Sequence, residues 1–160
     1  RVGRINNKQS TVADTEIELF LAEKSLSLSA TLDTQTAYAG ASFIIVATPT
    51  DYDSDKNRFD TSSVDTVVEE ALRLNKEALV IIKSTIPVGH TGLLQGKYGT
   101  DRVVFSPEFL RGTVGADPTK EFLEQEFSIF GGEDARFWHE IFKPVLPKLK
   151  TVPSSYKVNP

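Results

Sequence analysis

Three short apolar runs, each followed within a few residues by a proline, constrain the fold of this chain most strongly. The runs cover residues 43–47, 78–82 and 103–105. They are continuous rather than alternating, which is typical of strands buried on both faces in a parallel sheet flanked by helices. Apolar residues at helical spacing in 62–74, and a shorter helical pattern at 90–98, separate the runs. The sequence therefore predicts an α/β fold, a doubly wound parallel sheet.

Weaker patterns predict further elements around this alternation. They are helices at 14–24, 34–39 and 135–142 and strands at 25–31 and 127–130. Asp14 should lie near the start of the first of these helices, because aspartate is a favoured N-cap residue. Gly40 should end the second helix, and Ser62 or Ser63 should cap the helix at 62–74.

The composition is that of an ordinary globular protein, and it excludes several functions. Of the 160 residues, 39% are hydrophobic and 25% are charged, and the formal net charge is −4. This charge gives no basic field for nucleic acid, and no apolar run approaches the roughly 20 residues that span a bilayer, so neither nucleic acid nor membrane is expected as a partner. The absence of cysteine is compatible with a cytoplasmic location and excludes a thiol nucleophile. The absence of methionine, even at position 1, suggests a fragment or a processed chain.

Polar residues follow each of the three predicted buried strands. They are Thr48-Pro49-Thr50, Ser84-Thr85 and Ser106-Pro107-Glu108. Ligands of open α/β sheets bind beyond the carboxyl ends of the strands. The sequence therefore predicts a ligand site at this edge of the sheet.

The residue types at this edge leave two interpretations open. Glu108 could act as a general base on water, or it could stabilise the start of a helix, and the two are equally supported. The Thr85 hydroxyl could hold a water or a cofactor hydroxyl. It could also satisfy backbone groups in the turn before Pro87, which the residues alone favour slightly. Thr50 has the same two interpretations.

No metal site is predicted. The acidic segment 51–57 alternates oxygen-bearing side chains, but an EF-hand loop needs glycine at position six and glutamate at position twelve, where this chain has Lys56 and Ser62. A solvated loop between strand and helix is the better interpretation. His90 and His139 are far apart and lack metal-ligand spacing. No G-x-G-x-x-G phosphate-binding fingerprint occurs either.

Three blocks of sequence resemble the UDP-glucose/GDP-mannose dehydrogenase family, and within it the UDP-glucose 6-dehydrogenases. They are IVATPTDYD at 45–53 with FDTSSV at 59–64, IKSTIPVG at 82–89, and FSPEFLR at 105–111. The resemblance runs from Arg1 to about Arg111 and continues more weakly through the strand and helix expected at 127–142. It implies that residues 1–150 form a partial, Rossmann-like dinucleotide-binding domain, with residues 151–160 as a tail or linker.

This resemblance implies that the full-length parent oxidises UDP-glucose to UDP-glucuronate with NAD as cofactor, and that it is a homodimer. The residues implied at the cofactor are Arg1, near the adenosine ribose, and Thr48, Pro49, Thr50, Ser84 and Thr85. Thr85 would also hold the catalytic water, and Glu108 would be the base that assists hydrolysis of the thioester intermediate. The sugar nucleotide would lie along Glu108, Phe109, Leu110 and Arg111.

Three departures from the family pattern limit this expectation. The first βαβ portion, which holds the glycine-rich turn, is missing, and Gly112 replaces a glutamate of the family motif. The catalytic cysteine is absent, so the piece alone should be inactive. Two alternatives therefore stay open: a noncatalytic nucleotide- or protein-binding module derived from this family, and a GDP-mannose 6-dehydrogenase.

Overall fold

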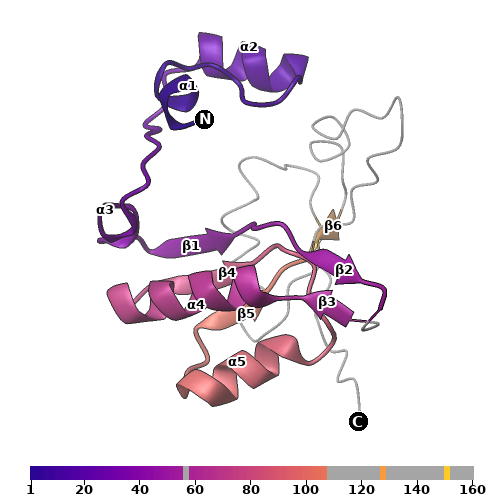
Figure 1. Cartoon of the computed structure of the whole chain (residues 1–160). Coiled ribbons are helices and arrows are strands. Elements are labelled where there is room, and N and C mark those ends of the chain that lie inside the picture. Colours follow the sequence, from indigo (N-terminus) through magenta and orange to yellow (C-terminus); the bar gives the residue numbers. More distant parts are fainter. Residues whose placement is uncertain (56–57, 108–126, 129–149, 152–160) are drawn as a thin grey trace.

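The computed structural model describes residues 1–55, 58–107, 127–128 and 150–151 (Figure 1). The elements in chain order are α1 (Val2–Asn6), α2 (Thr15–Glu23), α3 (Thr34–Tyr38), β1 (Phe43–Val46), β2 (Asp51–Asp53), β3 (Arg58–Asp60), α4 (Ser62–Leu74), β4 (Leu79–Ile82), α5 (His90–Tyr98), β5 (Val103–Phe105), β6 (Phe127–Ser128) and β7 (Lys150–Thr151). The predicted alternation of apolar strands with helices is therefore confirmed for β1, β4 and β5.

These three strands form a parallel sheet in the order β1-β4-β5. Ile44 stands opposite Val80 across β1 and β4, and Val80 stands opposite Val103 across β4 and β5. The chain passes through α4 between β1 and β4 and through α5 between β4 and β5. Parallel strands need such crossover connections, because a tight turn cannot bring the chain back to the same end of the sheet. The predicted α/β class is confirmed.

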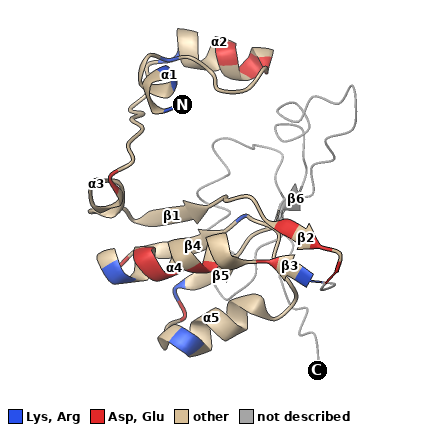
Figure 2. Cartoon of the chain, in the orientation of Figure 1, with Lys and Arg blue, Asp and Glu red and all other residues tan. Residues whose placement is uncertain are grey.

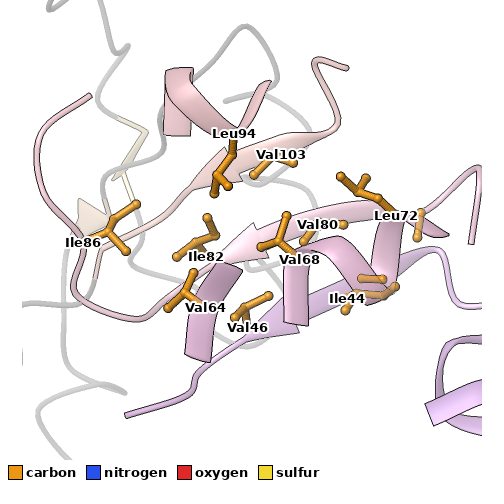
Figure 3. Packing of buried hydrophobic residues seen from close by; sticks show 12 residues of the cluster. Ile44, Val46, Val64, Val68, Leu72, Val80, Ile82, Ile86, Leu94 and Val103 are labelled. Carbon is orange, nitrogen blue, oxygen red and sulfur yellow. The ribbon is translucent and has the colours of Figure 1, made fainter. Parts of the chain in front are cut away.

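The core lies between this sheet and the two crossover helices. α4 buries Val64, Val68, Ala71 and Leu72, which recur at helical spacing along one side of the helix, and α5 adds Leu94. They pack in one cluster with the sheet residues Ile44, Val46, Val80, Ile82 and Val103 (Figure 3). Since α4 and α5 share this cluster, both helices cover the same face of the sheet.

The prediction that each strand is buried on both faces is correct for β4 but wrong for β1. In β4, Val80, Ile81 and Ile82 are all buried. In β1, Ile44 and Val46 are buried, whereas Ile45 is 59% exposed. β1 lies at the edge of the sheet, and α4 covers only one of its faces. A continuous apolar run therefore predicts a strand, but the helices and strands packed against that strand determine which of its side chains are buried.

The segment predicted as a solvated loop after β1 instead contains strands. β2 and β3 pair as an antiparallel hairpin in which Asp51 stands opposite Asp60. Tyr52 and Phe59 meet edge to face across the two strands, with ring centroids 5.1 Å apart. Aromatic cross-strand pairs stabilise hairpins. The loop prediction rested on the failed EF-hand pattern, which does not test for such a cross-strand pair.

Residues 25–31 form no strand, so this prediction is also wrong. A strand needs a neighbour to pair with, and no described strand lies alongside this segment. Its backbone instead bonds to a side chain: the Asn6 amide donates to the Ala30 carbonyl at 3.0 Å and accepts from the Ala30 N–H at 2.7 Å. Leu28 is left 52% exposed.

The helix starts are only partly as predicted. Asp14 is the N-cap of α2, accepting a hydrogen bond from the Ile17 N–H at 3.0 Å, which confirms the expectation. α4, however, has Thr61 as its N-cap residue, and the Asp60 carboxylate accepts from the Ser62 N–H at 2.9 Å. The assignment of the cap to Ser62 or Ser63 is therefore wrong. Gly40, just beyond α3, has φ +68°, as expected of a residue that ends a helix.

Several expected elements fall wholly or partly outside the described residues. Of the strand expected at 127–130, β6 covers Phe127–Ser128, and it pairs in parallel with β7, which the sequence did not predict. The helix expected at 135–142 and almost all of the tail lie outside. α1 was not predicted; together with α2 it stands apart from the parallel sheet in Figure 1. Within the described ranges, no helix has the length and apolarity to cross a membrane.

The start of α3 should make unfolding sensitive to acid. The Asp33 carboxylate accepts from the Thr36 hydroxyl and from the Gln35 N–H, and the Thr36 hydrogen bond is the largest cause of a pKa below the ordinary 3.8. A carboxyl whose pKa is lowered on folding adds stability above its unfolded pKa, about pH 4, and this stability is lost as pH falls through the folded pKa.

Thr36→Val removes that hydrogen bond and should make unfolding less sensitive to acid. We expect its urea midpoint to lie below that of the parent at pH 7, and the difference to shrink at pH 3. A difference of equal size at both pH values would contradict this explanation.

Candidate functional site

The carboxyl ends of β1 and β4 are tied together by Thr48 and Ser84. The Ser84 hydroxyl donates to the Thr48 carbonyl at 2.7 Å, and the two hydroxyls lie 3.5 Å apart. The Ser84 N–H also donates to the Val46 carbonyl at 3.2 Å. Ser84 is buried, and a buried hydroxyl whose hydrogen bonds are made within the protein serves the framework. These two side chains therefore shape the site more than they face a ligand.

Ser63, in the first turn of α4, fastens the turn after β1. Its hydroxyl donates to the Pro49 carbonyl at 2.8 Å and lies 3.1 Å from the Thr48 hydroxyl. The sequence singled out Ser63 only as a possible helix cap. The available signal was a serine in the first turn of a helix, but its side chain bonds to the turn after β1 instead of capping its own helix.

The end of β5 reaches the same edge of the sheet. The Ser106 N–H donates to the Ile82 carbonyl at 3.0 Å, and the Lys83 ammonium donates to the Ser106 hydroxyl at 3.4 Å. Ser106 is 1% exposed. The predicted convergence of polar strand ends is thus confirmed for all three strands, and Lys83 is a member that the sequence analysis did not select.

Thr50 and Thr85 differ from this framework. Thr85 is exposed and Thr50 half-buried. Neither hydroxyl takes part in a hydrogen bond within the described part of the chain, whereas those of Thr48, Ser63 and Ser84 do. Hydroxyls that donate and accept are suited to ribose hydroxyls and phosphate oxygens. Of the residues predicted at the cofactor, Thr50 and Thr85 are therefore the two best placed to bind one.

The structure does not bring every predicted site residue together. Arg1 is exposed and precedes α1, in the pair of helices that stands away from the sheet (Figure 1). Pro49 lies in the turn that Ser63 fastens, and it is exposed. The predicted residues from Glu108 to Arg111 lie outside the described part of the chain, and so does Gly112.

A cavity of about 430 Å³ lies beside this edge. Its walls come from the β2–β3 hairpin, the start of α4, and Pro87 in the loop that follows β4. At the same place the first turns of α4 and α5 are linked, with Asp65 Oδ1 and His90 Nε2 2.6 Å apart. The loop bearing Thr85 is therefore bounded by the parallel sheet on one side and by this pair on the other.

The charges around the edge are uneven. Figure 2 shows acidic residues along the hairpin, where Asp53 and Asp60 line the cavity together with Arg58. Carboxylates repel the phosphates of a dinucleotide, so the hairpin is a poor phosphate contact. The uncharged hydroxyls of Thr50 and Thr85 suit a nucleotide better. The described residues fit a nucleotide along the strand ends, away from the hairpin.

Comparison with known proteins assigns these features to a family. Residues 1–146 match the UDP-glucose/GDP-mannose dehydrogenase family, NAD binding domain. A UDP-glucose 6-dehydrogenase of Streptococcus pneumoniae is 47% identical over 111 residues, which are 69% of this chain and 28% of that protein. The corresponding enzyme of Campylobacter jejuni is 42% identical over 111 residues, with the same two shares. The chain thus spans 28% of the length of these curated relatives.

A solved structure supports the fold. A ternary complex of GDP-mannose dehydrogenase from Pseudomonas aeruginosa superposes with a TM-score of 0.71 at 21% sequence identity, covering 93% of this chain and 37% of that one. At this identity the likeness concerns the fold alone. It agrees with the Rossmann-like parallel sheet seen here.

Proposed function

The chain belongs to the UDP-glucose/GDP-mannose dehydrogenase family and matches its NAD-binding domain, and we propose that it takes part in the NAD-dependent oxidation of UDP-glucose to UDP-glucuronate. One observation carries this proposal: within the described residues the hydroxyls of Thr50 and Thr85 make no hydrogen bond, whereas those of Thr48, Ser63 and Ser84 beside them do. Polar groups that are free to bond a ligand and whose backbone is already held in place lose little entropy when the ligand binds.

The residues at this edge divide into two roles. NAD, when bound, supplies the hydride acceptor for the reaction. Thr50 and Thr85 would hydrogen-bond the cofactor, while Thr48, Pro49 and Ser84 fix the backbone on which those two hydroxyls stand. Thr85 would also hold the water that hydrolysis consumes, with Glu108 as the base that takes its proton. Because the chain has no cysteine, the thiol that the family chemistry needs is not among these residues.

UDP-glucose is favoured over GDP-mannose as the sugar nucleotide. Two curated relatives, at 47% and 42% identity, are both UDP-glucose 6-dehydrogenases. Residues from Glu108 to Arg111 are proposed to line the sugar-nucleotide site, and Arg1 to contact the adenosine end of NAD. The partial dinucleotide-binding domain is proposed to span residues 1–150.

Removing either uncommitted hydroxyl should weaken NAD binding without weakening the fold. We expect Thr50→Val and Thr85→Val each to raise the NAD dissociation constant of the 160-residue chain about threefold to tenfold, the value of one hydrogen bond. Valine keeps the shape of threonine, and neither hydroxyl bonds within the described structure, so the urea midpoint should stay unchanged. Isothermal titration calorimetry with NAD measures the first quantity.

Thr15→Val is the matched control, because Thr15 is an exposed threonine at the start of α2 and away from the sheet. It should leave NAD affinity unchanged. A parent chain that shows no saturable NAD binding would overturn the proposal for this chain. So would equal losses in Thr15→Val and Thr85→Val. Competition between UDP-glucose and GDP-mannose in the same titration tests the choice of sugar nucleotide.

A further inference from the structure

The loop between β4 and α5, residues 83–89, carries Thr85 and is held at three points. At its start, Ser84 is bonded to the Val46 and Thr48 carbonyls. In its middle, Ile86 is 8% exposed and belongs to the core cluster. At its end, the His90 N–H donates to the Pro87 carbonyl at 3.1 Å, around Gly89 at φ +86°. Between these points Thr85 is exposed, and Val88 is 92% exposed.

At the third point, the residue that closes the loop is also bonded to another helix through its side chain. His90, the first residue of α5, has Nε2 2.6 Å from Oδ1 of Asp65 in the first turn of α4. An ionised carboxylate only accepts hydrogen bonds, so the histidine nitrogen donates. The His90 side chain is 13% exposed and that of Asp65 is 38% exposed. The His90 ring is therefore largely shielded from solvent, whereas the Asp65 carboxylate is partly open to it, so solvent screens this bond less than a fully exposed pair.

The Asp65–His90 bond joins the first turns of α4 and α5, the ends of the two helices that lie nearest to Thr50 and Thr85 in the chain. Thr50 lies between β1 and the β2–β3 hairpin that leads into α4, and α5 follows the loop that carries Thr85. Ser63, which lies two residues before Asp65, bonds the first turn of α4 to the Pro49 carbonyl. The Asp65–His90 bond therefore closes a chain of contacts that runs from the Thr50 turn, through the start of α4, to the far end of the Thr85 loop.

We propose that Asp65 and His90 form a positioning bridge that fixes the Thr85 loop relative to the Thr50 turn and so sets the affinity for NAD. The inference rests on the proposed function for its cofactor. Neither residue touches NAD in this proposal. Each acts through the loop whose end it holds, and no family feature in the sequence analysis singled out either residue for such a role.

The chain contains a matched control for helix packing. The Tyr98 hydroxyl, in the last turn of α5, donates to the Glu69 carboxylate of α4 at 2.9 Å. This bond also joins α5 to α4, but it lies at the opposite end of α5 from the Thr85 loop. If the Asp65–His90 bond merely held two helices together, removing the Tyr98–Glu69 bond should have the same consequences.

The first measurement is hydrogen exchange, in the 160-residue chain without NAD, of the two amides that bond back to the loop end: the N–H of residue 90, which donates to the Pro87 carbonyl, and that of Leu93, which donates to the Gly89 carbonyl. We expect His90→Phe, which keeps a ring but removes the donor, to speed exchange about tenfold, because loss of one anchoring bond lowers the local opening free energy. His90→Gln offers a donor at a position close to Nε2 and should stay within about threefold of the parent. Tyr98→Phe should leave these amides unchanged.

The second measurement is the NAD dissociation constant of the same variants. We expect about a tenfold rise for His90→Phe, recovery toward the parent value for His90→Gln, and no change for Tyr98→Phe. Loop exchange that is unchanged in His90→Phe would overturn the bridge. Equal effects of Tyr98→Phe and His90→Phe would also overturn it, because the bond would then be ordinary packing. If the parent binds no NAD, the proposed function fails, while loop exchange still decides whether the bridge exists.

Discussion

Ile82→Ala is expected to destabilise the chain by about 2–5 kcal/mol, the range for removing a large aliphatic side chain from a closed core. Ile82 is 0% exposed and ends β4, the central strand of the parallel sheet. Its neighbours in the cluster come from both crossover helices and from both flanking strands, so no single element can move in to fill the space (Figure 3). Urea unfolding, with free energies compared at equal slope, measures the loss.

Ile45→Ala provides the same chemical change on the same sheet. Ile45 lies on β1 with 59% of its surface exposed, on the face opposite the cluster. Little is lost when an exposed side chain is truncated, so the expected cost is below about 1 kcal/mol. Similar costs for Ile45→Ala and Ile82→Ala would show that the two faces of the sheet are equally buried, contrary to the structure.

These two isoleucines also show how far the sequence could predict the fold. Both lie in continuous apolar runs, and a run of that kind locates a strand because the signal is local. Which face is covered depends on the elements packed against it, and α4 covers only the Ile44 side of β1. The strand predicted at residues 25–31 is wrong for a related reason: their alternation suits a strand, but none of the described strands lies beside them.

The sequence predicted where the candidate site lies, but not which role each of its residues has. Four hydroxyl residues follow β1 and β4, and the sequence does not distinguish their roles. The direction of each side chain separates them: those of Thr48 and Ser84 turn toward one another, while those of Thr50 and Thr85 make no hydrogen bond to any residue that the structure describes. Side-chain direction at a strand end follows from the turn geometry, which one-dimensional patterns do not contain. The Asp65–His90 contact could not be predicted either, because the two residues are 25 positions apart in the sequence and meet only in the folded chain.

The second large effect is expected at Asn75, the residue after α4. Its side-chain amide donates to the Tyr38 carbonyl at 2.8 Å and to the Ala41 carbonyl at 2.9 Å. Its side-chain carbonyl accepts from the N–H groups of Glu77, at 2.9 Å, and Ala78, at 2.8 Å. One side chain therefore fastens the end of α4 to the segments that lead into β1 and into β4.

Asn75→Ala should cost about 2–4 kcal/mol, because it removes four hydrogen bonds of about 1 kcal/mol each and water can replace some of them. The Ala78 N–H is the group least able to find water, since Ala78 is 0% exposed. Asn75→Asp keeps the two bonds in which the side chain accepts and loses the two in which it donates. Because the new carboxylate oxygen faces the Tyr38 and Ala41 carbonyl oxygens, its cost should be at least that of Asn75→Ala, and a cost near zero would contradict the assigned pairs.

The position of Asn75 allows stability to be separated from binding. It acts where the chain enters β1 and β4, whereas Thr50 and Thr85 lie where the chain leaves those strands. Loss of stability at the entry end lowers the fraction of folded chain without moving the hydroxyls at the exit end. Asn75→Ala should thus lower the urea midpoint while the folded fraction keeps the NAD affinity of the parent. A fall in that affinity would mean that the strands transmit strain along their length, and the framework at Thr48 and Ser84 would then be too weak to isolate the site.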